Sequence, residues 1–186
     1  FPNAAATDIA IFRISQTPNF NVGGSNPTSF LGRFEANAAI TFQNSGLKIF
    51  RNGIIGTGNI TQLSTSGQFQ ITGTSAQLGG TGSINLDAAG LLNASSAVNT
   101  LLISNKTVNA SAGGTFALET SSLFNAQTFV VSGSCNFTVN SGSNLVMGSV
   151  DGITTGAAGN IQVSGTRSFS TSGVYIYNAA ANQTTG

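Results

Sequence analysis

The amino-acid sequence predicts an all-β protein that folds as a parallel β-helix, or β-solenoid. Charged residues are scarce, with 6 Lys and Arg and 5 Asp and Glu among 186 residues, so patterns typical of surface helices are nearly absent. Short runs that alternate apolar and polar residues recur along the chain, and 24 Gly together with many Asn supply corners where a positive φ is needed. Loosely spaced short strands separated by such corners are typical of coils that stack on one another.

Residues 1–35 differ in pattern from the rest of the chain. The run from Asp8 to Ile14 is apolar on both faces and predicts a strand. The stretch from Pro18 to Pro27 is loop-like, with glycines and asparagines around its second proline. We expect a junction strand and a protruding loop over 1–35, with an N-terminal cap as the structural alternative. Residues 36–186 are expected to form β-solenoid coils that are continuous with neighbouring copies.

Five expected strands share one motif, in which a glycine and any residue precede two apolar residues separated by a polar or small one. Their glycines are 15, 32, 19 and 26 residues apart, a mean of 23, which falls in the range of solenoid repeats. The unequal spacing indicates a degenerate repeat. The motif occurs at Gly67–Ile71, Gly82–Leu86, Gly114–Leu118, Gly133–Phe137 and Gly159–Val163.

An antiparallel β-sandwich is the competing fold, because it is also built from short strands with frequent turns. Hairpin signals are few, however, and only Asn52-Gly53 is a candidate. In-register stacking places like residues above each other, so it favours strand faces without charge. The large aromatic residues should fill the core of the coils. Among 13 Phe, the predicted core residues are Phe69, Phe116, Phe129, Phe137 and Phe169.

Cys135 is the single cysteine, so the chain has no internal disulfide framework. It alternates with Phe137 and Val139, which places the three side chains on one face of a strand. This pattern predicts a small buried hydrophobe. The chain contains no His, so the usual base that activates a thiol nucleophile is missing.

The composition argues against several classes of function. A net charge of +1 with six scattered basic residues gives no basic patch, so we expect no nucleic-acid partner. No apolar stretch reaches the length of about 18–20 residues that a membrane helix needs, so we expect no membrane insertion. The first residues lack a signal-peptide pattern, which suggests a mature or excised segment. With no His and no calcium-loop motif, we predict no metal site and no cofactor.

We predict that the chain is not an enzyme and has no catalytic residues. The acids are far apart in sequence, and no pair has the spacing of a catalytic motif. Stacked coils can bring distant residues together, so a carbohydrate-active β-helix enzyme remains an alternative. We interpret Glu119 and Asp151 as solvated turn residues, and Arg167 as covering Tyr175 or Tyr177 or binding a carbonyl. The five acids are Asp8, Glu35, Asp87, Glu119 and Asp151.

The C-terminal run resembles a known family. Its ordered elements are Asp151-Gly152-Ile153, Gly159-Asn160-Ile161-Gln162, Gly165-Thr166-Arg167-Ser168-Phe169, Tyr175-Ile176-Tyr177-Asn178 and Gln183-Thr184-Thr185-Gly186. This order is similar to a repeat of very large secreted surface proteins of Bacteroidota, which are described as adhesin-like. The match covers about the last 45 residues, and the preceding part is similar only in style. In that family the last element runs on into an apolar-Pro junction, so the resemblance implies that Gly186 of one copy leads into Phe1-Pro2 of the next.

The fold class and the resemblance together suggest a structural and adhesive role. We expect a repeat of an extracellular cell-surface fibre that attaches to surfaces or glycans, with neighbouring copies of the same repeat and surface polysaccharides as partners. Weak contacts repeated along tandem copies would gain avidity without a strong single site. A subunit that polymerises into an extracellular filament is the first alternative function, and a carbohydrate-active enzyme is the second.

Overall fold

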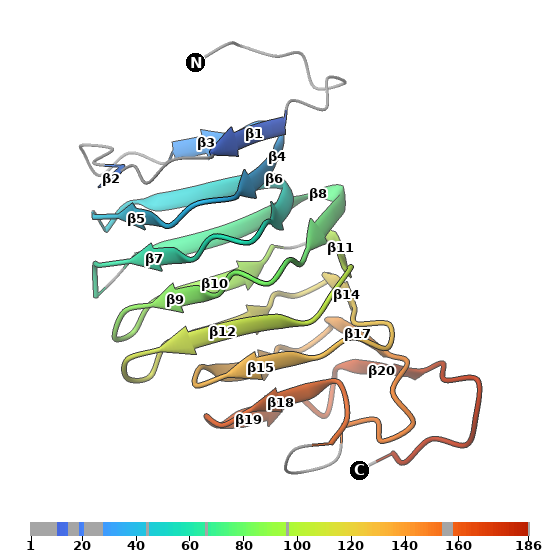
Figure 1. The fold of residues 1–186 in the computed structure, drawn as a ribbon. Helices are drawn as coiled ribbons and strands as arrows, with labels where there is room; N and C mark the ends of the chain where they lie inside the picture. Colours follow the sequence, from blue (N-terminus) through green and yellow to red (C-terminus); the bar gives the residue numbers. More distant parts are fainter. Residues whose placement is uncertain are drawn as a thin grey trace.

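The computed structural model describes residues 11–14, 19–20, 28–43, 45–65, 67–95, 97–153 and 158–185, with the backbone alone for those before residue 29. Every regular element in these ranges is a β-strand, and no described helix is long and apolar enough to cross a membrane. The strands stack into a β-solenoid whose first strands and last strands lie at opposite ends (Figure 1). All strand pairs are parallel, as in β9 with β12, so the solenoid prediction is confirmed and the antiparallel sandwich is excluded.

The pairing divides the strands among three faces, which the chain visits in the order first, second, third. The first face contains β3 (Thr28–Phe30), the beginnings of β6 (Leu47–Ile55) and β8 (Gln68–Leu78), β10 (Leu91–Ala94), β13 (Thr115–Leu118), β16 (Asn136–Val139) and β19 (Arg167–Phe169). The second face contains β1 (Ile11–Ile14), β4 (Arg33–Ala36), the ends of β6 and β8, β11 (Asn99–Leu102), β14 (Leu123–Asn125), β17 (Asn144–Met147) and β20 (Val174–Tyr177). The third face contains β2 (Asn19–Phe20), β5 (Ile40–Phe42), β7 (Ile60–Gln62), β9 (Ile84–Leu86), β12 (Lys106–Ala110), β15 (Val131–Gly133) and β18 (Ile161–Val163).

The turns of the solenoid differ in length. The register pairs Ile40 with Ile60 and Ile84 with Val108, which gives turns of 20 and 24 residues. The last turn has 30 residues because the connection between β17 and β18 is longer than its counterparts. The spacing of the sequence motif is looser than these turn lengths, because its five copies precede strands of different faces.

Asn52-Gly53 forms a bend inside β6 and no hairpin. The pairing of β6 with β8 shifts register between Arg51 and Gly53, where the chain passes from the first face to the second. Asn52 and Gly53 have φ values of 64° and 98°, the left-handed region that Asn and Gly tolerate best. The dipeptide therefore makes a corner of the solenoid.

Inward side chains form a continuous apolar core. Phe30, Phe34 and Phe50 pack with ring centroids 4.9–5.1 Å apart near the N-terminal end. In the following turns, Phe116 packs edge-on against Phe137 at 5.3 Å. Such aromatic pairs add to the free energy that their burial contributes.

Three of the five predicted core phenylalanines are fully buried, namely Phe69, Phe116 and Phe137. Phe129 and Phe169 are only partly buried against the core. Phe169 lies in β19, and no described strand follows it to cover the outer side of its ring. Phe129 lies in the connection between β14 and β15 and has no place within a strand. The predicted loop between Pro18 and Pro27 lies mostly outside the described residues.

Candidate functional site

The described acidic residues lie in different turns and do not form a cluster. Glu35 accepts a hydrogen bond from Asn37, and Asp87 accepts one from Ser111 in the next turn. Glu119 is half-buried, whereas Asp151 is exposed in a turn. Among the described residues, no group of three or more His, Cys, Asp or Glu could hold a metal ion. Asp8 lies outside the described residues.

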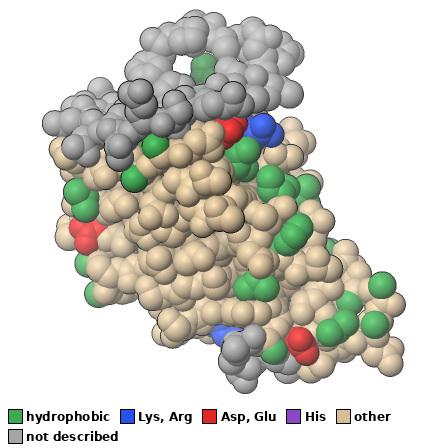
Figure 2. Space-filling view, in the orientation of Figure 1, with side chains coloured by type: hydrophobic (Ala, Val, Ile, Leu, Met, Phe, Trp, Pro, Cys, Tyr) green, Lys and Arg blue, Asp and Glu red, His purple; other side chains and the backbone are tan. Residues whose placement is uncertain are grey.

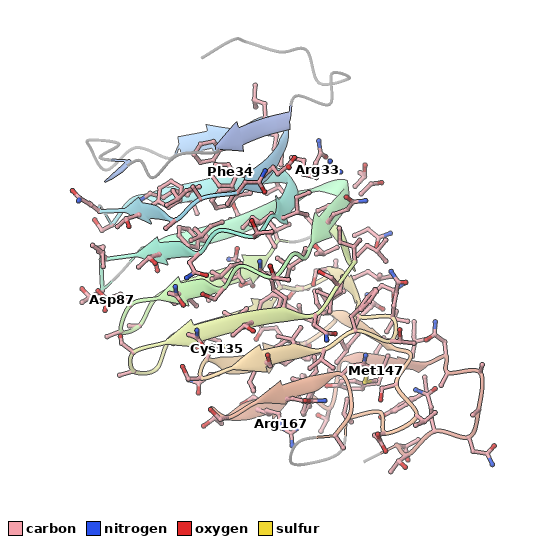
Figure 3. All side chains as sticks on the ribbon, viewed as in Figure 1. Arg33, Phe34, Asp87, Cys135, Met147 and Arg167 are labelled. Atoms are coloured by element: carbon pink, nitrogen blue, oxygen red, sulfur yellow. The ribbon has the colours of Figure 1, made fainter. Side chains whose placement is uncertain are left out.

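Cys135 is fully buried in the core, as its alternation with Phe137 predicts (Figure 3). Burial raises the pKa of its thiol to about 12, although a backbone hydrogen bond opposes this effect. The thiolate is therefore scarce at neutral pH, and the residue is a packing group.

Arg167 binds the carbonyl oxygen of Ile161 through Nη1 at 2.9 Å, one of the two roles that the sequence suggested. It is paired in register with Phe137 and thus ends the inward column of the first face (Figure 3). Lys48 belongs to the same column, on the far side of Phe69. Its Nζ donates to the Gly46 carbonyl. The two cations therefore occupy the column on either side of its apolar part.

Lys106 was not foreseen as an inward residue, and it is 2% exposed. Its Nζ donates to the carbonyl oxygens of Gly79 and Gly82, at 3.0 and 2.6 Å, in the preceding turn. Desolvation lowers the pKa of this amine from 10.5 to about 8. The ammonium group therefore replaces its lost water with backbone carbonyls.

Two amide side chains hold the same corner of later turns. Asn160 donates to the carbonyls of Gln127 and Phe129, at 2.8 and 2.6 Å. Gln183 donates to the carbonyls of Met147 and Ser149, at 3.0 and 2.7 Å. We call this arrangement, in Lys106, Asn160 and Gln183, the carbonyl clamp. Each clamp lies between the second and third faces and donates to two backbone carbonyls of the preceding turn.

The outward side of the third face carries a ladder of uncharged polar side chains. Asn109 donates to Asn85 Oδ1 at 3.0 Å, and Asn85 donates to Thr61 Oγ1 at 3.2 Å. Thr41 is in register with Thr61 in the adjacent turn. No outward charged side chain occurs in the described strands of this face, and Figure 2 shows few charged groups on the visible surface as a whole. The ladder offers amide and hydroxyl groups to hydroxylated or hydrated surfaces.

Comparison of the chain with protein-family models, with curated proteins and with solved structures found no match. The carbonyl clamps could not be predicted from the sequence, because their partners lie a whole turn away and no local motif marks them.

Proposed function

We propose that this chain is a non-enzymatic structural and adhesive segment of a secreted, cell-surface fibre. The observation that carries the proposal is a continuous solenoid whose third face is a ladder of uncharged polar side chains. Such a rod can hold many weak contacts at fixed spacing, and repeated weak contacts give avidity. The resemblance of residues 142–186 to repeats of adhesin-like surface proteins supports an extracellular location.

Adhesion is tested by measuring binding of the purified protein to immobilised polysaccharides, with release of reducing ends as the readout for turnover. We expect binding without turnover. Replacing Asn85 and Asn109 with Asp should weaken binding to neutral or anionic surfaces, because charge is introduced into the ladder. Asn140→Asp is the control, because Asn140 lies after a strand of the first face and the substitution introduces charge outside the ladder. Turnover that is lost when an acidic residue is replaced would support the enzyme alternative and contradict the proposal.

Assembly into a filament is a second candidate, and the C-terminal end of the solenoid favours it. Inward residues donate their backbone N–H to the following turn, as Ile60 does to Ser83 and Val131 does to Asn160, both at 2.8 Å. No described strand pairs with β18, β19 or β20 on the side away from the preceding turn, and the inward residues of these strands direct their N–H groups to this edge of the described sheets. An open edge is a template for another strand.

The side chains and the path of the chain at the C-terminal end are compatible with the addition of a further turn. Phe169, Tyr175 and Tyr177 continue the inward columns but are only partly buried. The Thr184 amide donates to the Val150 carbonyl at 2.8 Å, and Gln183 forms a carbonyl clamp, so residues 178–185 follow the corner path of the turn before. A neighbouring copy of the chain is the partner that would extend the same three sheets, by a head-to-tail contact that does not close.

Electron microscopy and sedimentation at increasing concentration test this second candidate. We expect unbranched filaments from the wild-type chain. The double variant Val174→Lys/Ile176→Lys should remain monomeric, because both side chains are exposed on the edge strand and lysines there oppose strand addition. Leu63→Lys, at a position 57% exposed in an earlier turn, is the control. A wild-type chain that stays monomeric at every concentration would contradict filament assembly and leave the adhesive role standing.

A further inference from the structure

A groove lies on the outer surface where β6 and β8 bend from the first face to the second. Its volume is about 580 Å³, within the range of ligand-binding sites. The bend opens it, because Asn52 and Gly73 have φ values of 64° and 106°. A Cβ atom at Gly73 would come to 3.0 Å from Asn52 Oδ1, so glycine keeps this part of the groove free. The groove is lined by Leu31, Ile49, Arg51, Asn52, Thr72, Gly73 and Thr74.

Arg51 gives the groove a positive charge. Its side chain is exposed, and it is the only cation among the described side chains for which no protein partner is present. No acidic residue is found among the described residues that line the groove. A guanidinium group in this setting favours a carboxylate, which it can bind through two parallel hydrogen bonds.

The neighbours of Arg51 suit a sugar ring. Leu31, 36% exposed, and Ile49 offer apolar surface beside the guanidinium. Thr72 is paired in register with Arg51, and its Oγ1 is shielded from solvent without a hydrogen-bond partner. Asn52 and Thr74 add an amide and a second hydroxyl. A ligand with a carboxylate, several hydroxyls and an apolar ring face would engage the exposed ones among these groups.

We propose that this groove binds the uronic-acid residues of an acidic polysaccharide, with Arg51 holding the carboxylate. The groove is partly open to solvent, so one sugar of a polymer could occupy it while the rest of the polymer stays outside. One charged contact per chain gives modest affinity, and repeated copies in a fibre would raise it by avidity. This inference rests on the proposed adhesive function and names its ligand class and its site.

Isothermal titration calorimetry with a short oligogalacturonate, supported by amide chemical shifts, tests the site. We expect Arg51→Gln to weaken binding about tenfold or more, because the carboxylate loses its partner. Leu31→Ser should weaken binding less, through loss of the apolar platform. The methyl-esterified oligomer should bind the wild-type chain as weakly as the acid form binds Arg51→Gln. Each variant should keep the wild-type circular dichroism spectrum, since both side chains are exposed.

Matched controls separate this site from general charge effects. Arg33 (labelled in Figure 3) lies outside the groove and donates to Gln77 Oε1. Arg33→Gln makes the same charge change there and should leave affinity unchanged. Equal loss in Arg33→Gln and Arg51→Gln, or equal binding of the esterified oligomer, would overturn the assignment. A wild-type chain that adheres to neutral glycans and ignores oligogalacturonate would overturn the groove alone. Oligogalacturonate binding without adhesion to any surface would overturn the adhesive function alone.

Discussion

Replacing the buried Lys106 with Met should change how stability depends on pH. The pKa of this amine is about 8 in the folded chain and 10.5 in the unfolded chain. Between these values the unfolded chain binds more protons, so the contribution of Lys106 to stability rises with pH. The destabilisation caused by burying the charged Lys106 amine is fully present below its pKa in the folded chain. It is lost as the pH rises toward the pKa in the unfolded chain. The difference between the two pKa values corresponds to about 3 kcal/mol in the free energy of unfolding.

The experiment compares urea unfolding of wild type and Lys106→Met, followed by circular dichroism from about pH 7 to about pH 10.5. We expect the wild-type free energy of unfolding, relative to that of the variant, to rise by about 3 kcal/mol over this interval. Burial raises the pKa values of Tyr175, Tyr177 and Cys135, which lowers stability at high pH. These groups are the same in both proteins, so their effect cancels in the difference.

Lys48→Met is the matched comparison, because desolvation lowers the pKa of Lys48 as well. Lys48→Met should therefore also reduce the rise of the free energy of unfolding with pH. The absolute stability of Lys106→Met at neutral pH does not decide the matter, since Met removes a desolvated charge but leaves the carbonyls of Gly79 and Gly82 without a donor. Parallel pH profiles for wild type and Lys106→Met would refute the assignment of a depressed pKa to this lysine.

Three further substitutions and one labelling reaction test the packing. Gly133→Ala should destabilise the fold strongly, because φ of Gly133 is +113° and a Cβ atom there would clash with the Val108 carbonyl oxygen. Gly113 has no atom within 4 Å of such a Cβ, so Gly113→Ala should lower the free energy of unfolding, measured by thermal unfolding, by only about 1 kcal/mol. Phe116→Ala should lower the free energy of unfolding by about 3–5 kcal/mol in urea, and a loss below about 1 kcal/mol would contradict its place in the core. Cys135 should react with a thiol reagent only after unfolding, and fast labelling of the native chain would contradict its burial.

The fold class could be predicted because glycine corners and alternating strands are local features. The face to which each motif strand belongs could not be predicted, because it depends on which residues pair across turns. Gly67 and Gly114 precede strands of the first face, whereas Gly82 and Gly159 precede strands of the third. Gly90 precedes β10 on the first face, 23 residues after Gly67, and was missed because the second inward residue of that strand is only an alanine.

Site residues were harder to predict than strands. The acids are far apart in sequence, but sequence spacing alone could not show whether stacked turns bring them together. In the structure the described acids lie in separate turns. The buried lysines could not be anticipated, because a lysine in an alternating strand suggests an outward side chain until its carbonyl partners in another turn are known. Arg51 was noted only as one of six scattered cations, and its groove depends on the left-handed bends at Asn52 and Gly73.

The parallel stacking of turns also determines how this chain would respond to force. The hydrogen bonds between strands run along the axis of the rod, so tension applied at the two ends acts on one turn at a time. A released turn of 24 residues extends to about 80 Å of chain, compared with about 4.8 Å of axial rise in the folded rod. Peeling of successive turns would therefore lengthen the molecule many times over while most of it stays folded. A surface fibre built this way would absorb a sudden load as an extensible tether.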